Sequence, residues 1–300
     1  MKRQTILAYA GLLFANICWG AGATVAKVTI QTFPPLLLSA VQMIIATLIL
    51  LVVQWRGGYP AILPADRWPM AGLGFVMNVA GFIFGYVGIA LTLPSDISLL
   101  VIGEVIFTAM LALWLLKERI IPTRWISLVV GIIGVVILLQ NAHGNNTATA
   151  PNRLLGNVLF LADMLCCAYY TVQGGVFLTR NHTVSLMTYV NAVSMLFWVP
   201  VLLWYIATGQ FPAIDMTSII SLLYLAGITS VVCIFLSFYA VTVVGATATT
   251  IGLLIQPLVG LFLGMVVMGD PISVIMIIGA ICVFASIALS IRASFREARI

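Results

Sequence analysis

The sequence predicts an all-α integral membrane protein with ten transmembrane helices, and three observations lead to this fold class. Of the 300 residues, 63% are hydrophobic and only 7% are charged, against roughly 25% charged residues in an average soluble protein. The mean hydropathy is +1.19. At about 20 residues for each crossing, the chain is long enough for about ten spans. Too little polar surface remains to cover a water-soluble fold, so a soluble globular protein is excluded.

Ten apolar runs, separated by short polar or proline-containing breaks, give the expected spans. Helices are expected because each span must satisfy its own backbone hydrogen bonds in hydrocarbon. The strands of a membrane barrel would be shorter and would alternate apolar with polar residues, and these runs show no such alternation. In chain order, the expected spans are residues 5–28, 34–55, 68–91, 94–116, 124–139, 154–178, 185–207, 218–243, 246–268 and 272–291.

Prolines mark the starts of two spans and the expected bends in two others. The second and fourth spans begin at Pro34 and Pro94. Asp96 then falls in the first turn of the fourth span, where a carboxylate interacts favourably with the helix dipole. In the seventh and ninth spans, Pro200 and Pro257 each remove a backbone hydrogen bond. They predict kinks that serve either packing or a moving hinge.

The distribution of Lys and Arg predicts the orientation in the membrane. With a cytoplasmic N-terminus, eleven of these cations fall on the cytoplasmic side and two, Lys27 and Arg153, fall on the other. This bias predicts a multi-pass protein of the inner (plasma) membrane with both termini cytoplasmic. It also explains the pI near 9.1 without a nucleic-acid partner, because the cations are scattered over loops and tails. A signal peptide cleaved near Ala21-Gly22-Ala23 is the alternative for the first segment, and it would leave nine spans.

Matching motifs at a fixed separation indicate an internal repeat. Glu118 follows Glu104 by 14 residues, and Asp270 follows Gln256 by 14 residues. The same offset of 152 residues aligns polar and aromatic residues of the third span with residues of the eighth. We therefore expect two copies of one five-helix unit.

An odd number of spans in each copy places the second copy upside down relative to the first. Two inverted halves can open a central site alternately to either side of the membrane, and this arrangement is typical of transporters. The expected division is a first five-helix repeat at 1–140, a linker rich in Asn, Thr and Ala at 141–153, and a second five-helix repeat at 154–300.

Three short motifs resemble those of the drug/metabolite transporter (DMT) superfamily, and most closely its EamA-type ten-span exporters, which include amino-acid exporters. They are Trp19-Gly20, the run from Glu104 to Ala109 followed by Glu118, and Gln256-Pro257-Leu258 followed by Asp270. The resemblance covers nearly the whole chain. It implies a secondary carrier of small solutes whose central cavity is lined by the first, third, fourth, sixth, eighth and ninth spans.

Glu104 in the fourth span and Asp163 in the sixth are the acids of greatest functional interest. A carboxylate within a span costs about 3 kcal/mol or more, so it is expected to face a cavity or a partner. Glu104 is the first candidate for coupling to protons or for binding a cationic group; the alternative is a protonated carboxyl that bonds a neighbouring helix. Asp163, with Tyr170 on the same helical face, either extends a relay or lies near the headgroups.

The other candidate residues are amide, hydroxyl and aromatic side chains within the spans. Such groups suit an amphipathic organic solute better than a bare ion. For each of them the alternative is a hydrogen bond that joins two helices. The candidate substrate-binding residues are Asn16, Trp19, Asn78, Tyr86, Glu104, Asp163, Tyr170, Gln173, Tyr239 and Gln256.

The leading interpretation is a secondary active transporter that exports a small metabolite, with an amino acid as one candidate, by alternating access. Its expected partners are the solute, coupling protons and the lipid bilayer. Efflux of cationic drugs or toxic compounds is the second interpretation, and a membrane enzyme or lipid-processing subunit is the third. We expect no enzyme activity, cofactor or metal: the five cysteines lack metal-ligand spacing, both histidines fall in loops, and there is no phosphate-binding glycine motif.

Overall fold

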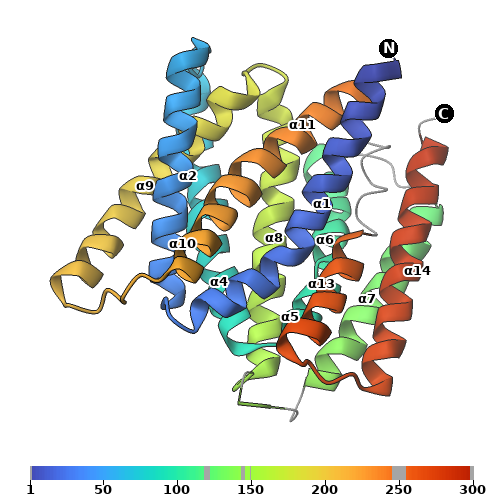
Figure 1. Cartoon of the computed structure of the whole chain (residues 1–300). Coiled ribbons are helices and arrows are strands. Elements are labelled where there is room, and N and C mark those ends of the chain that lie inside the picture. The colour runs from blue at the N-terminus through green and yellow to red at the C-terminus, as the bar shows by residue number, and fades with distance from the viewer. Residues whose placement is uncertain (1, 118–121, 143–145, 149, 245–254, 298–300) are drawn as a thin grey trace.

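The computed structural model describes residues 2–117, 122–142, 146–148, 150–244 and 255–297, and these are almost entirely helical (Figure 1). Among them, eight helical stretches are long and apolar enough to cross a membrane, and two shorter apolar stretches follow near the C-terminus. The predicted all-α membrane fold is therefore confirmed. Glu118, part of the expected linker and the first part of the ninth expected span lie outside the described residues.

Each expected span coincides with a helix or with a stack of short helical segments. The first half contains α1 (Lys2–Ile30), α2 (Pro35–Gly57), η1 (Pro64–Asp66), α3 (Arg67–Gly74), η2 (Phe75–Gly81), α4 (Phe82–Leu91), α5 (Pro94–Leu100), α6 (Ile102–Leu111), η3 (Ala112–Leu116) and α7 (Pro122–Ala142). The second half contains α8 (Arg153–Leu178), α9 (Thr183–Ala207), α10 (Met216–Leu223), η4 (Tyr224–Val232), α11 (Cys233–Val244), α13 (Ile255–Met268) and α14 (Val274–Glu297).

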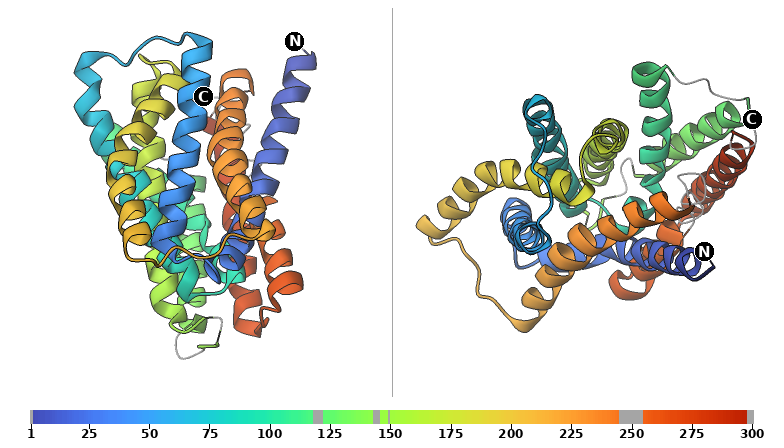
Figure 2. Two further views of the ribbon diagram at one scale, coloured as in Figure 1. Left: turned by 60° about the vertical axis from the view of Figure 1, so that its left-hand side comes forward. Right: turned by 90° about the horizontal axis from the view of Figure 1, so that it is seen from above.

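The two halves run in opposite directions through the molecule. Helix α1 begins at the end where both chain termini lie, whereas α8 begins at the opposite end (Figures 1 and 2). We call these the terminal end and the distal end. At the terminal end Arg180 lies 3.0 Å from Asp66, and at the distal end the hydroxyls of Thr32 and Ser218 lie 3.5 Å apart. The inversion is the one expected from five spans in each half.

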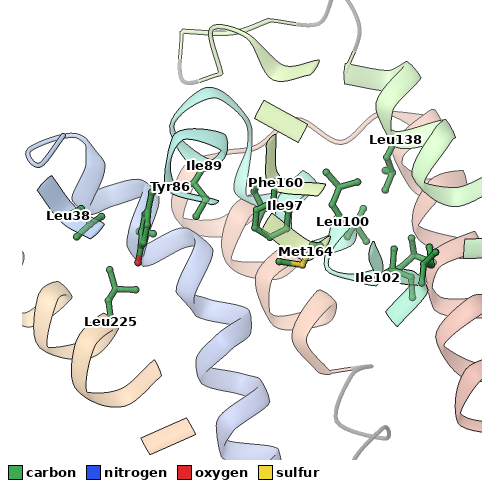
Figure 3. Packing of buried hydrophobic residues seen from close by; sticks show 14 of the residues in the cluster. Leu38, Tyr86, Ile89, Ile97, Leu100, Ile102, Leu138, Phe160, Met164 and Leu225 are labelled. Carbon is green, nitrogen blue, oxygen red and sulfur yellow. The ribbon is translucent and has the colours of Figure 1, made fainter. Parts of the chain in front are cut away.

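Packing between the halves follows a pseudo-two-fold relation. The second and fifth spans contact their own counterparts, since α2 packs against α9 and α7 packs against α14. Helix α1 packs against α11 and α13, while its counterpart α8 packs against the equivalent helices α4 and α6. The main hydrophobic cluster draws residues from both halves, including Tyr86, Phe160, Met164 and Leu225 (Figure 3). Burial of these apolar side chains therefore holds the halves together.

A π-helical segment interrupts the third span of each half, which the sequence did not predict. The offset of 152 residues places η2 on η4 to within a few residues. A side chain from the facing half bonds to each segment: Trp198 Nε1 donates to the Asn78 carbonyl at 2.7 Å, and Gln42 Nε2 donates to the Leu225 carbonyl at 3.2 Å. Because π-helical turns are rare and often occur at functional sites, their paired placement supports the repeat and directs attention to these two spans.

Exposed tryptophans mark the terminal end as a membrane interface. Trp55, Trp68, Trp114 and Trp125 lie at helix ends there and are 50–86% exposed. Tryptophan is enriched where hydrocarbon meets the headgroups, because its ring is apolar and its indole N–H is polar.

Candidate substrate-binding site

Glu104 lies at a break in the fourth span. A turn at Val101 separates α5 from α6, and the Glu104 N–H donates to the Val101 carbonyl at 3.0 Å. The carboxylate therefore falls in the first turn of α6, where the helix dipole favours a negative charge. Its Oε1 accepts a hydrogen bond from Thr171 Oγ1 of α8 at 3.3 Å. The expected continuous span is thus two helices, and the acid occupies their junction.

The carboxylate of Asp163 lies against two glycines of the third span, where no side chain fills the space. A Cβ atom added at Gly85 would stand 2.6 Å from Asp163 Oδ2, and one added at Gly81 would stand 3.0 Å from Oδ1. The Cys167 thiol lies 3.7 Å from Oδ1, at the distance of a weak hydrogen bond. Asp163 comes ten residues after the start of α8, which corresponds to about 15 Å of helix. This depth favours an interior position over one among the headgroups.

The two acids lie near each other between the third, fourth and sixth spans. A Cβ added at Gly103, next to Glu104 in the sequence, would stand 3.3 Å from the Cβ of Met164, next to Asp163. Within the described parts of the chain, neither acid forms an ion pair with Lys, Arg or His. Negative charge without a cationic partner is costly in a membrane, which makes such groups candidates for binding protons or a cationic ligand. Glu104 comes from the first half and Asp163 from the second, so movement between the halves changes the surroundings of both.

Three of the other candidates bond to protein groups. The Tyr86 hydroxyl is buried and bonds Gln42 Oε1 of α2. Trp19 Nε1 donates to the Thr229 carbonyl of η4 at 3.1 Å. Asn16 Nδ2 donates to the carbonyl one turn earlier in α1, at 2.8 Å. Tyr86 and Trp19 therefore join helices in this conformation.

Two candidates keep buried polar atoms that no described residue satisfies. Asn78 Nδ2 in η2 is a donor without a hydrogen-bond partner, and Gln256 Oε1 in α13 is an acceptor without one. A buried unsatisfied amide costs about 1–3 kcal/mol. The two residues lie on the third and ninth spans, on opposite halves of the chain.

Of the remaining three candidates, two lie beside apolar clusters, and the third lies on α8 between the acids and the terminal end. Tyr239 packs in a small cluster with Ala8 and Leu12 between α1 and α11. Tyr170 borders a different apolar cluster, which contains Met70 of α3. Gln173 is half-buried on α8, beyond Thr171 toward the terminal end. The structure therefore gathers Glu104 and Asp163 but does not gather all ten candidates.

Sequence reasoning missed Thr171, Cys167 and Gln42. Asp163, Cys167 and Thr171 recur every four residues and so share one face of α8, a spacing that could have identified the last two. Gln42 lies in an otherwise apolar span, and only its three-dimensional position shows that it bonds both Tyr86 and the eighth span. Gly81 and Gly85, four residues apart on the third span, allow α8 to approach closely.

A cavity at the distal end lies away from this site. It measures about 190 Å³ and is lined by residues at the end of α1 and the start of α10, none of which is among the ten candidates; they include Thr29, Thr32, Asp215 and Ser221. Asp215 caps α10 there, since its Oδ1 accepts from the Ser218 N–H at 2.9 Å. The hydrogen bonds from Ser218 lower the pKa of Asp215 below its ordinary value. Asp215 is exposed and serves below as a control.

Comparison with known proteins gives several similar chains. YetK of Bacillus subtilis, named "Uncharacterized transporter", is 23% identical over 97% of this chain and 88% of its own. An Escherichia coli protein named "Probable amino-acid metabolite efflux pump" is 25% identical over 73% of each chain. The E. coli protein YedA, named "Uncharacterized inner membrane transporter", is 25% identical over 91% of this chain and 87% of its own. These names describe transporters and an efflux pump.

Structure comparison and a family match agree with these similarities. A crystal structure with 18% sequence identity matches 99% of both chains with a TM-score of 0.65, which shows a shared fold. The model of the EamA-like transporter family matches twice, at residues 6–140 and 154–292. Together these two matches cover most of the sequence. The chain belongs to the EamA-like transporter family of the drug/metabolite transporter superfamily.

Proposed function

We propose that the protein is a secondary active transporter of the inner membrane that exports a small metabolite by alternating access, with amino acids as the first candidates. Family membership supports transport, and the name of an E. coli relative supports this choice of solute. The observation that carries the proposal is the proximity of Glu104 and Asp163, one acid from each half, without a cationic partner among the described residues.

Proton coupling follows from that proximity. When the two halves move relative to each other, both the groups that neighbour Glu104 and Asp163 and the hydration of the two carboxyls change. The tendency of a carboxyl group to hold a proton depends on both. In the proposed cycle the site takes up protons while open to one side and releases them while open to the other, and solute moves in exchange. Asn78 and Gln256 supply a donor and an acceptor for the solute.

Efflux of cationic compounds is the second candidate, because the uncompensated acids also attract a cationic solute. Catalysis is not part of the proposal, since a transport cycle accounts for the inverted halves and for the neighbouring acids.

The direct test compares the medium of cells that produce the protein with that of cells that produce the Glu104→Gln variant at the same level. We expect one or a few amino acids or related metabolites to accumulate several-fold outside the cells with the unchanged protein only. Growth with a panel of cationic drugs, measured in the same two strains, addresses the second candidate. Identical metabolite profiles together with identical drug tolerance in the two strains would contradict both.

We also propose that both termini are cytoplasmic. The distribution of exposed charge supports this orientation. The exposed Lys and Arg side chains at the terminal end include Arg56, Arg67, Lys117, Arg180 and Arg292. At the distal end, Lys27 and Arg153 are both buried. The proposed repeats remain 1–140 and 154–300, joined by 141–153, and the two family matches fall within these bounds.

Cysteine labelling tests the orientation. In a background without the five native cysteines, Ala61→Cys at the terminal end and Ile272→Cys at the distal end both lie at exposed positions. We expect an impermeant maleimide added to intact spheroplasts to label Ile272→Cys but not Ala61→Cys, and the reverse pattern in inverted membrane vesicles. Labelling of Ile272→Cys from the cytoplasmic side alone would overturn the orientation.

A further inference from the structure

Four charged residues form a buried cluster at the distal end. Lys27, Asp96, Arg153 and Asp270 are each 0–7% exposed. They comprise two cations and two anions, so the cluster as a whole is neutral. By charge counting, Lys27 and Arg153 are the two cations expected on this side of the membrane. The structure shows instead that both are internal.

Asp96 is the centre of the cluster. Arg153 donates to it through two nitrogens, Nε to Oδ2 at 2.5 Å and a terminal guanidinium nitrogen to Oδ1 at 2.7 Å. Asn157 Nδ2 donates to the same carboxylate at 3.1 Å, and the Thr92 hydroxyl donates at 3.4 Å. A two-point guanidinium–carboxylate contact fixes both distance and orientation. It joins the fourth span of the first half to the sixth span, which begins the second half.

The other two charges add contacts beside this pair. Lys27 Nζ donates to the carbonyls of Ile89 and Thr92 at 2.7 and 2.8 Å, at the C-terminal end of α4, where the helix dipole favours a cation. Asp270 Oδ2 accepts from the Ser95 N–H at 2.8 Å, which joins the loop after α13 to the start of α5. Both the Asp96–Arg153 and the Ser95–Asp270 contacts cross from one half to the other.

The repeat relates each of these four residues to a position at the terminal end, and the residues at those positions do not have the same set of charges. The first and sixth spans align at an offset of 148 residues, which sets Cys18 against Cys166, and the other spans align at 152. Under these offsets Lys27, Asp96 and Arg153 correspond to uncharged residues, and only Asp270 corresponds to an acid. These counterparts are Gly175, Ala248, Thr5 and Glu118. The two ends of the fold therefore differ in charge although they are related by the repeat.

Among the residues that the structure describes, an ion pair also lies at the terminal end, and it is weaker. Asp66 and Arg180 lie 3.0 Å apart, and Arg180 is 51% exposed, so water screens the pair. The same offsets relate these residues to Ser218 and Thr32, whose hydroxyls meet at the distal end. Each end thus has contacts that join the halves. Among the described residues, the distal pair buries both of its charges, whereas the terminal pair buries Asp66 but leaves Arg180 exposed.

The exposure of the α8 residues to the surroundings also differs between the two ends of the molecule. On the face that carries the acid site, Asp163 and Cys167 are half-buried, whereas Thr171 and Gly175 are exposed. Exposure therefore increases from the acid site toward the terminal end. Toward the distal end, Asn157 and its neighbours in the cluster are buried.

We propose that Lys27, Asp96, Arg153 and Asp270 form the distal gate of the transport pathway, closed in this conformation, and that each transport cycle must separate Asp96 from Arg153. This inference rests on the proposed transport function. When the gate opens, water hydrates the separated charges. Removing one partner leaves the other charge unpaired only in the closed state, because water compensates it in the open state. Loss of the Asp96 charge should therefore shift the protein toward the state that is open at the distal end.

The test measures the access of a reagent to the acid site from each side. Thr171→Cys, in the background without native cysteines, places a thiol beside Glu104. Membranes of both orientations are treated with an impermeant maleimide. We expect Asp96→Asn to raise the rate of labelling from the distal side about tenfold or more and to lower the rate from the terminal side, as a shift in population requires.

Three further variants complete the test: one changes a second residue of the gate, and two are controls. Asp270→Asn removes a charge from the gate but keeps an oxygen that can accept from Ser95, so we expect a smaller shift in the same direction as for Asp96→Asn. This variant tests the gate even if Asp96→Asn fails to fold. Asp66→Asn weakens the terminal ion pair and should shift access the opposite way. Asp215→Asn changes an exposed acid at the distal end and should change neither rate. Gel filtration confirms that each variant used is folded.

The outcomes distinguish the gate from the function. Unchanged distal labelling in every folded gate variant, or a shift in the same direction by Asp66→Asn, would overturn the gate. Solute export is measured separately with the native cysteines present. An absence of export by the unchanged protein, together with the expected labelling shifts, would overturn the transport function and leave the gate as a conformational element.

Discussion

Replacing Glu104 by glutamine is expected to abolish the dependence of solute transport on a pH gradient in proteoliposomes. Glutamine has nearly the same shape, and its side-chain oxygen can still accept the hydrogen bond from Thr171 Oγ1, which is 3.3 Å from Glu104 Oε1. It cannot release a proton at any pH of interest. The change therefore removes the proposed proton site while preserving the contact between α6 and α8. Uptake is measured with and without an imposed gradient, at equal reconstituted protein.

Companion variants separate the roles of the neighbouring groups. Asp163→Asn should also reduce gradient-driven transport strongly if the two acids act together. Thr171→Val removes only a hydrogen-bond donor and should have a smaller effect. Asp215→Asn, a carboxyl-to-amide change at an exposed helix cap, controls for the change in net charge. Undiminished gradient-driven uptake by Glu104→Gln would eliminate Glu104 as the coupling residue.

Much of the fold could be predicted from sequence because the membrane imposes local rules. A backbone in hydrocarbon must form helices, so long apolar runs suffice to place the spans. The expected runs from 34 and 154 become α2 and α8 with ends shifted by one or two residues. The inversion required only an odd number of spans in each repeat, together with motifs that recur at a fixed offset.

The site was harder to predict because its geometry depends on contacts between distant residues. Asp163 was expected either in a relay or near the headgroups, and its seat against Gly81 and Gly85 depends on how α8 crosses the third span. The break at Val101, which places Glu104 in a first helical turn, lies beside Gly103, but a single glycine within an apolar run does not by itself predict a break.

The distal cluster was missed for a similar reason. Charge counting treats every Lys and Arg near a helix end as an exposed anchor. Arg153 finds its partner Asp96 57 residues away, and Lys27 finds the Ile89 carbonyl 62 residues away. Such pairing is visible only when the helices are packed together.

Replacing Gly156 by valine is expected to prevent accumulation of folded protein, and Gly156→Ala is expected to lower stability by about 1–3 kcal/mol through overpacking. At this point α8 crosses the third span with the two backbones in contact. A Cβ at Gly156 would stand 2.8 Å from the Gly88 carbonyl oxygen and 2.8 Å from Thr92 Cβ. Neither neighbour is the flexible end of a side chain, so the helices themselves would have to separate.

The strain at Gly156 would extend to the gate, because separating α8 from the end of α4 also moves Asn157 and Arg153 away from Asp96. Gly175 is a matched control on the same helix, since nothing lies within 4 Å of its Cβ position. There alanine removes the conformational freedom of glycine at no steric cost and should stabilise the helix by about 1 kcal/mol. The fraction of each variant that stays monodisperse in detergent after heating gives the order of stability. If Gly156→Ala tolerated heat as well as Gly175→Ala does, the close backbone contact between α4 and α8 would not be needed for folding.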